Sequence, residues 1–317
     1  MSQPVRIARR AAIFILTLIA SSVVVFGLMA ALPGDPARVA LGLDATPASV
    51  AALRHEFGLD QPLPIRFLEW WRSLVTLDFG QSYVTHADIG SEIADRIPVT
   101  LILVGAALII AMIIAVPMGT VMAVRHRKLS GVVLSAASQI GVAVPTFLAG
   151  ILLVALFAVG LGWLPANGWT DPDVDFIMFL KQLTLPALAL GLVQGAIMAR
   201  YVRSSILDVQ RQDYIRTARA KGLPPSKALV RHGMRNAAIP VVTVLALQLA
   251  YLLIGAVVVE RVFVIPGLGS LLIDSVSIRD LNVVQDIVML LVAAVLLINF
   301  LVDVLYDVID PRLRAAT

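Results

Sequence analysis

The chain has 317 residues, of which 59% are hydrophobic and only 15% are charged, and its mean hydropathy is +0.91. Soluble domains contain roughly 45–50% apolar and about 25% charged residues, so this composition excludes an ordinary water-soluble protein. The lack of cysteine in the sequence excludes disulfides and thiolate metal sites, and the formal net charge of +4 is informative only through its placement.

Six stretches of the sequence are long and apolar enough to cross a bilayer. Because a helix rises about 1.5 Å per residue, about 20 residues span the roughly 30 Å of hydrocarbon. The first stretch follows three arginines, as a signal peptide would, but it exceeds the roughly 7–15 residues of a signal core, so we expect a retained span. The predicted spans are residues 11–32, 97–124, 131–161, 179–199, 237–259 and 283–305.

Prolines lie inside these spans or near their ends. Each one removes a backbone donor and favours a bend, although proline is also commoner in membrane helices in general. The candidate kinks are Pro98, Pro117, Pro145, Pro186 and Pro240.

The cationic residues mark one side of the membrane. Arg and Lys collect in residues 1–10, 125–128 and 200–236 and again in the C-terminal segment 307–317, whereas the intervening loops are acidic or mixed. Such clusters in short loops are typical of the cytoplasmic side. We therefore predict an all-α membrane protein of about six transmembrane helices with both termini in the cytoplasm.

The largest predicted extracytoplasmic piece, residues 33–96, contains helix signals. Thr46 as N-cap, Pro47 at the first helical position and Gly58 just past the end bracket one short helix.

A second short helix is predicted over residues 64–75. Apolar residues recur on one of its faces at spacings of three and four, at Ile65, Leu68, Trp71 and Val75. Adjacent Trp70 and Trp71 suit a helix at the membrane surface. Packing on the outer ends of the spans is the alternative, and the two are compatible.

Sequence motifs for catalysis or nucleotide binding are missing. No Gly-x-x-x-x-Gly-Lys-Ser/Thr pattern occurs, and the four histidines form no His-Glu-x-x-His pattern. We therefore expect a chain that is not an enzyme and holds no metal, and whose energy comes from elsewhere.

The charged residues of the predicted spans lie toward the span ends. Asp286 and Asp303 lie toward opposite ends of the sixth span, and Glu260 and Arg261 lie at the outer end of the fifth. Snorkelling or pairing at the membrane interface is the role expected of them. A proton-coupled carrier would instead need buried ionisable groups near mid-membrane. Neutral polar residues that could line a pathway or join helices are Gln139, Gln194, Gln248 and Asn299.

Gly191 and Gly195 form a small-x-x-x-small step in the fourth span. Such a step lets two helices approach closely, but a chain with 21 glycines contains such pairs by chance.

The basic loop 200–236 has the strongest local structure of any predicted interior loop. A helix from Asp213 is expected to end at Gly222, and Pro224-Pro225 then makes a turn into a second helix. Ser226 is expected to cap this second helix, with Leu229 and Val230 on its apolar side. If the loop only marked the cytoplasmic side, this would explain its positive charges but not the turn formed by its glycine and prolines. A DNA-binding helix-turn-helix is disfavoured because both ends are tethered to spans. A rigid docking element for a cytoplasmic motor remains.

These residues resemble the integral membrane permeases of binding-protein-dependent ABC importers, in the dipeptide and oligopeptide branch. The segment DYIRTARAKG at 213–222 is similar to their cytoplasmic Glu-Ala-Ala loop, with Arg216 and Thr217 in place of Glu and Ala, and RHGMRNAAIP at 231–240 resembles its exit. Leu281-Asn282 departs from the branch's usual aromatic residue and proline. Further similar motifs are LPGDPA at 32–37, FGLDQP at 57–62, DFGQS at 78–82, PTFL at 145–148, RYVRSS at 200–205, FVIPGLG at 263–269 and DPR at 310–312.

The resemblance implies a type I importer permease in a bacterial cytoplasmic membrane, with a five-span core over residues 97–306. It also implies a second homologous permease, two cytoplasmic ABC ATPases that bind ATP and Mg²⁺, and an extracytoplasmic solute-binding protein. No cofactor on this chain and no nucleic acid is expected. The implied ATPase-coupling residues are Asp213, Tyr214, Arg216, Thr217, Ala218, Lys221, Gly222, Pro225, Ser226, Leu229, Val230 and Arg235.

The resemblance predicts di- and oligopeptides as the imported substrates. Similar permeases serve nickel complexes, glutathione or oligosaccharides, so these stay open as alternatives. A proton-coupled carrier is the alternative from a different class.

Overall fold

The computed structural model describes residues 3–42 and 45–309, and in this part of the chain no β-strand forms. The helices form two compact units. One holds the described residues up to Thr100 and from Pro266 onward, and the other is Leu101–Ile265. The motif at 310–312 and the end of the predicted C-terminal segment lie outside the described residues.

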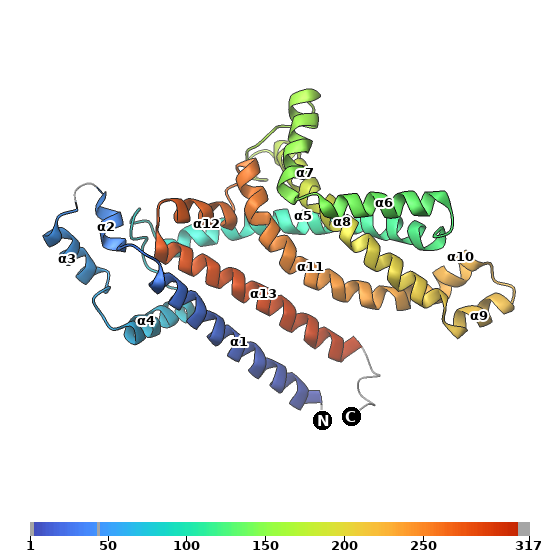
Figure 1. The fold of residues 1–317 in the computed structure, drawn as a ribbon, viewed down its shortest axis with the longest axis horizontal. Helices are drawn as coiled ribbons and strands as arrows, with labels where there is room; N and C mark the ends of the chain where they lie inside the picture. Colours follow the sequence, from blue (N-terminus) through green and yellow to red (C-terminus); the bar gives the residue numbers. More distant parts are fainter. Residues whose placement is uncertain (1–2, 43–44, 310–317) are drawn as a thin grey trace. The chain divides into compact units, whose positions relative to one another are not determined.

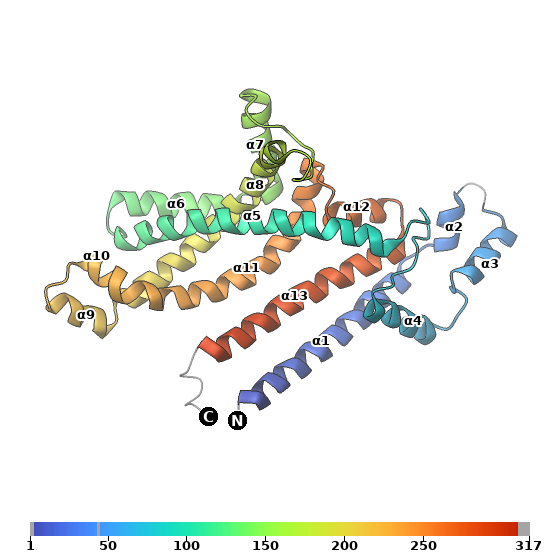
Figure 2. The same ribbon diagram turned by 180° about the vertical axis from the view of Figure 1, so that it is seen from behind.

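In the first unit, the two terminal helices lie antiparallel and side by side (Figures 1 and 2). They are α1 (Gln3–Ala31) and α13 (Leu281–Ile309), which contain the predicted first and sixth spans. The rings of Phe14 and Phe300 pack between them with centroids 5.3 Å apart. Arg10 Nη1 lies 3.8 Å from Asp303 Oδ1, so the predicted pairing of this span-end charge is confirmed.

Short helices complete the first unit: α2 (Pro36–Leu41), α3 (Pro47–Glu56), α4 (Leu63–Thr76) and α12 (Leu268–Ser277). The start of α5 (Ile89–Val124) packs with them. Thr46 caps α3 as predicted, since its hydroxyl accepts from the Ser49 amide while the Ser49 hydroxyl accepts from the Thr46 amide. The apolar core contains Ile89, Ile93, Leu268, Leu271, Val283 and Ile287.

Helix α4 packs on the outer parts of α1 and α13 through its two tryptophans. Trp71 Nε1 donates to Ser22 Oγ at 2.7 Å, and Trp70 Nε1 donates to Asp286 Oδ1 at 2.7 Å. The predicted apolar face is divided, because Trp71 points inward whereas Leu68 is 66% exposed and Val75 is 67% exposed. The packed alternative is therefore confirmed, and an apolar stripe still faces outward.

The second unit contains the rest of α5 together with α6 (Leu129–Ala143), α7 (Thr146–Leu153), η2 (Val154–Gly160), α8 (Phe176–Gln210) and α11 (Met234–Phe263). Helix α8 crosses α5 closely at the predicted glycine step. A Cβ added to Gly191 would lie 2.6 Å from Ile110 Cγ2, and one added to Gly195 would lie 3.1 Å from Ile114 Cβ. Of the two readings that the sequence leaves open, the glycine step therefore marks a tight helix crossing rather than a chance pair.

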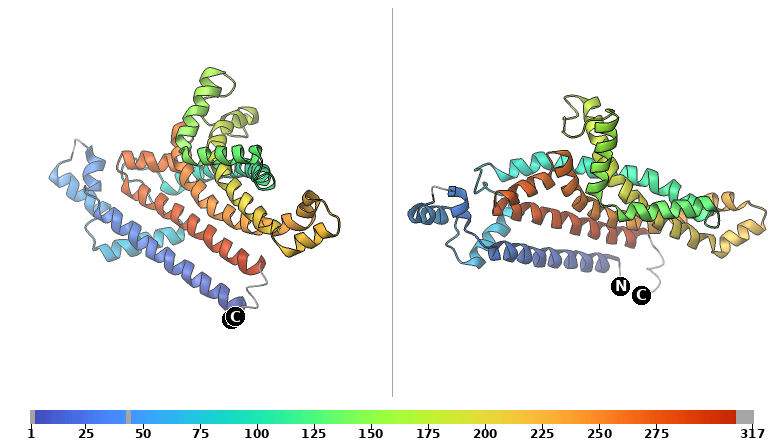
Figure 3. Two further views of the ribbon diagram at one scale, coloured as in Figure 1. Left: turned by 45° about the vertical axis from the view of Figure 1, so that its right-hand side comes forward. Right: turned by 45° about the horizontal axis from the view of Figure 1, so that its top comes forward.

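The predicted third span, 131–161, is not one straight helix. Its halves, Leu129–Ala143 and Thr146–Gly160, are bent by 102°, and Figure 3 shows α7 turning away from α6. Val144 is extended, as the residue before a proline prefers, and Pro145 has no amide hydrogen to continue the helix.

The other predicted kink prolines lie within continuous helices. Pro98 and Pro117 are inside α5, Pro186 is inside α8 and Pro240 is inside α11. Among the residues that the structure describes, five helices are long and apolar enough to cross a membrane. The bent pair would make a sixth span if its two halves are counted together. The all-α, about six-span prediction is confirmed.

Candidate functional site

The predicted coupling loop lies between the end of α8 and the start of α11, and its short helices extend past both helices (Figure 1). Helix α8 continues to Gln210, so helical structure reaches well into the charged segment. Next come α9 (Asp213–Ala220), a turn at Gly222, α10 (Pro225–Ala228) and η3 (Leu229–Gly233), which leads directly into α11. Gly222 adopts φ +93°, a conformation that favours glycine.

One face of α9 anchors the loop in the core of the second unit. Ile215 and Ala218, three residues apart, are both buried, and Ile215 packs in one cluster with Val209 of α8 and Leu229 of η3. Gly233 permits this approach: a Cβ there would lie 2.8 Å from Leu229 Cδ1 and 3.0 Å from Val209 Cγ1. The loop is therefore packed like a core element rather than held only at its ends.

Two hydrogen bonds tie the loop and its flanking helices to each other. Asn236 Nδ2 donates to Tyr214 Oη at 2.9 Å, which joins the start of α11 to α9. Ser205 Oγ donates to the buried Ala237 carbonyl at 2.7 Å, which joins α8 to α11. Packing and hydrogen bonds together make α9, η3 and the adjoining helix ends one connected body.

The outward surface of the loop is basic. Arg216 and Asp213 form an exposed ion pair at 3.5 Å, of the kind that contributes little to stability. Val230 is 70% exposed and borders a hollow of about 340 Å³ that Lys227 and Arg231 also line. The other exposed residues among those predicted to couple are Tyr214, Thr217, Lys221, Gly222, Pro225, Ser226 and Arg235.

Two details of the predicted loop are wrong. Ser226 does not cap the second helix, because α10 begins at Pro225, Pro224 occupies the N-cap and no side-chain cap forms. The fixed φ angle of Pro225 suits the first position of a helix, and the residue before a proline prefers an extended conformation, so the helix starts at Pro225. Leu229 and Val230 were expected on one apolar face, yet Leu229 is buried and Val230 is exposed.

Other residues that build the site carried no signal specific enough to single them out. Gly233 and Asn236 contribute by contacting residues that are distant in the sequence. Asn236, for example, donates a hydrogen bond to Tyr214, which lies 22 positions earlier. Ile215 gave a weak signal through its spacing with Ala218, which is typical of a helix with one buried face.

Two of the four candidate pathway residues pair with each other in the second unit. Gln194 of α8 donates to Gln248 of α11, and both side chains are buried, so this pair joins two helices. Gln139 is exposed on α6, and Asn299 belongs to α13 in the first unit. Their role as pathway residues stays a prediction.

Known proteins match this chain over most of its length. Residues 115–315 match the family described as binding-protein-dependent transport system inner membrane component, and residues 5–104 match the N-terminal membrane component of such systems. The chain is 42% identical, over 298 residues, to glutathione transport system permease proteins GsiC of Salmonella typhi and of Escherichia coli strain K12, covering 94% of this chain and 95% of each relative.

A solved structure shares the fold. The crystal structure of an amino acid ABC transporter with histidines matches with a TM-score of 0.51 and 18% identity, over 68% of this chain and 93% of that one. The family matches extend over most of the chain and agree with the predicted spans. The chain therefore belongs to the inner-membrane permease subunits of bacterial binding-protein-dependent ABC importers, in the class for peptides, glutathione and nickel.

Proposed function

We propose that this permease forms half of the pathway for short peptides in an ATP-driven importer, and that α9 and η3 receive the motion of the ATPases. The observation that carries the coupling proposal is the close packing of the loop against α8 and α11. Gly233 permits close contact with Leu229 and Val209, and the Asn236–Tyr214 hydrogen bond joins α11 to α9. A floppy loop would absorb a displacement. A packed one passes it to α8 and α11.

The partners of the proposed complex follow from the family. A second homologous permease would complete the pathway, two ATPase subunits or domains would bind ATP and Mg²⁺, and a solute-binding protein would deliver the substrate outside. Membership in this importer family favours this assembly over the proton-coupled carrier, which needs no ATPase.

In the proposed mechanism, ATP-driven closure of the ATPases moves the loop as a rigid body. The exposed, basic surface around Val230 is the proposed contact, and buried Ile215 and Leu229 pass the displacement inward. The permease then changes between two states that ATP on a partner chain biases.

Short peptides are the proposed substrate class, and glutathione, a tripeptide, falls within it. The 42% identical relatives are named glutathione permeases, which supports glutathione without distinguishing it from other small peptides. Nickel complexes remain the second candidate because the family class includes them.

Uptake by the reconstituted complex tests the proposal. Proteoliposomes holding the two permeases, the ATPases and the cognate binding protein are supplied with labelled glutathione, labelled trialanine or ⁶³Ni²⁺. We expect ATP-dependent accumulation of at least one peptide. Accumulation of nickel alone, or of no peptide under conditions where the binding protein stimulates ATP hydrolysis, would contradict the proposed substrate class.

A further inference from the structure

A pocket opens within the first unit, on the side predicted to be extracytoplasmic. It lies among the outer ends of α1 and α13, the helices α3 and α4, and the segment that precedes α5, and its volume is about 460 Å³. Pockets that bind small molecules are usually about 300–1,000 Å³. This one is therefore large enough for an amino acid derivative or a short peptide.

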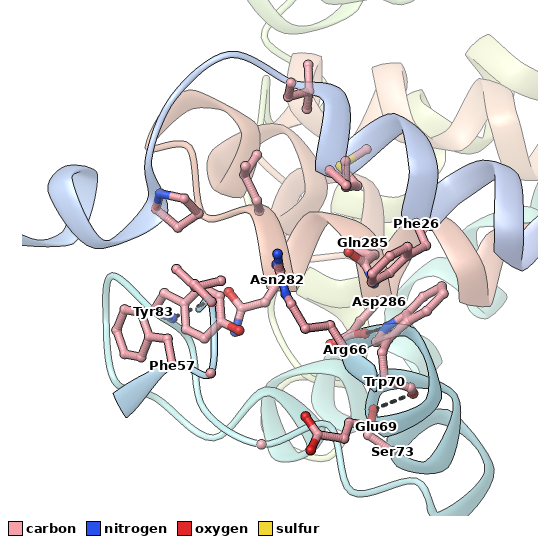
Figure 4. A pocket seen from close by; sticks show the side chains of 18 of the residues that line it. Phe26, Phe57, Arg66, Glu69, Trp70, Ser73, Tyr83, Asn282, Gln285 and Asp286 are labelled. Carbon is pink, nitrogen blue, oxygen red and sulfur yellow. Dashed lines mark hydrogen bonds between the residues drawn. The ribbon is translucent and has the colours of Figure 1, made fainter. Parts of the chain in front are cut away.

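Aromatic rings form two opposite walls of the pocket (Figure 4). Phe57 and Tyr83 stack with ring centroids 4.2 Å apart on one side, and Phe26 and Trp70 stack at 5.9 Å on the other. Burial raises the pKa of the Tyr83 phenol, so the hydroxyl stays protonated and can donate. The walls offer apolar surface with a polar group at the edge, which is common in ligand pockets.

Three of the five Asp, Glu and Arg side chains that line the pocket, Asp35, Arg54 and Asp286, already have a polar partner. Arg54 Nη1 lies 2.9 Å from Asp35 Oδ2, and Asp286 accepts the hydrogen bond of Trp70. Arg66 is the cationic residue left over: it is partly buried, and its guanidinium makes no hydrogen bond or ion pair among the residues that the structure describes. Glu69 follows three positions later on α4 but forms no ion pair with it in that part of the chain.

Figure 4 shows Arg66 between the two aromatic walls, with Gln285 on the neighbouring helix α13. Within the described chain, the Gln285 amide has no hydrogen-bond partner either. A guanidinium presents a planar fork of donors that matches a carboxylate, and a nearby amide can donate or accept at a peptide group. An unpaired cation and a free amide between apolar walls are complementary to a carboxylate with a small organic body.

We propose that this pocket binds the free carboxylate end of a short peptide, with the Arg66 guanidinium as its anchor. The choice of a peptide rests on the proposed function, whereas the carboxylate follows from the unpaired guanidinium of Arg66. The site would hold peptide on the permease separately from the binding protein. Arg66 then determines affinity, and the aromatic walls tolerate different side chains.

Equilibrium binding to the purified importer tests the inference. The complete complex of permeases and ATPases, in phosphatidylcholine nanodiscs and without the binding protein, is dialysed against labelled trialanine or its C-terminal amide. We expect saturable trialanine binding and at least about tenfold weaker binding of the amide, because one charge-assisted contact is lost. Arg66→Gln should weaken trialanine binding about equally and leave the difference between the two peptides small.

A matched control lies on the same helix. Arg72 is exposed on α4 and does not line the pocket, so Arg72→Gln should bind trialanine like the parent. Equal affinity for the acid and the amide, or an Arg66→Gln complex that binds like the parent, would overturn the inference. Displacement of trialanine by short-chain phosphatidylglycerol at lower concentrations than by free peptide would overturn it in favour of a lipid phosphate.

The same preparations separate this inference from the proposed function. Peptide uptake with the binding protein, together with no carboxylate-dependent binding in its absence, would refute the pocket and leave the importer proposal intact. Carboxylate-dependent binding that needs Arg66, in a complex that imports no peptide, would support the pocket and refute the proposed substrate class.

Discussion

Asn236 Nδ2 lies 2.9 Å from Tyr214 Oη, although 22 positions separate the two residues. The bond joins the first turn of α11 to the first turn of α9. Removing it with Tyr214→Phe should lower peptide uptake per ATP hydrolysed by up to about fivefold, since a typical hydrogen bond contributes about 1 kcal/mol. Uptake and ATP hydrolysis are measured together in proteoliposomes.

Tyr201→Phe is the matched control for this prediction. Tyr201 is an exposed residue of α8 whose hydroxyl makes no hydrogen bond in the described part of the chain. Equal coupling ratios in the two variants would show that the Tyr214 hydroxyl plays no part in transmission.

Substitutions at the two loop glycines, Gly233 and Gly222, should have different effects. A Cβ at Gly233 meets Leu229 and Val209, so Gly233→Ala should destabilise the protein by about 1–3 kcal/mol. Gly222 has open space around it but a φ of +93°, so Gly222→Val should distort the turn locally and reduce uptake while the protein still inserts. Thermal unfolding in detergent and uptake assays distinguish the two. Normal uptake by Gly222→Val would count against the assigned docking loop.

The crossing of α5 and α8 predicts that replacing glycine by alanine has opposite effects on stability at two positions of α5. A Cβ at Gly119 would lie 2.6 Å from the Ala199 carbonyl oxygen, whereas nothing lies within 4 Å of one at Gly105. Gly119→Ala should therefore lower the free energy of unfolding by about 1–3 kcal/mol, and Gly105→Ala should raise it by about 0.5–1 kcal/mol through helix propensity. Equal effects, measured by thermal unfolding, would contradict the close approach.

Asp280 should make the stability of the first unit depend on pH. Its buried carboxyl accepts a hydrogen bond from Ser82, and burial raises its pKa above the usual value. A raised folded-state pKa means that this group stabilises the fold when protonated and that the contribution is lost as the pH rises through the folded-state pKa. Asp280→Asn should therefore raise the thermal midpoint at pH 7.5. The gain should shrink as the pH falls toward about 4, and a gain that grows on acidification would refute the assignment.

Much of the fold could be predicted because the signals are local. Apolar runs located the spans, and Thr46 with Pro47 located the start of α3. The break at Val144-Pro145 was one of five equivalent proline candidates, since whether a helix kinks or breaks depends on tertiary packing. Tyr214–Asn236 and the Arg66 pocket depend on residues far apart in the sequence, so no periodicity could reveal them.

Crosslinking from the loop tests the central claim most directly. The chain contains no cysteine, so Val230→Cys can carry a single maleimide-benzophenone group in the assembled importer. Val174→Cys is the control, because Val174 is equally apolar and 79% exposed but lies in an acidic loop predicted outside. The account predicts a light-dependent product with the ATPase from position 230 and none from 174. An assembled complex that gives no ATPase product from position 230, or gives it only from 174, would contradict the coupling role.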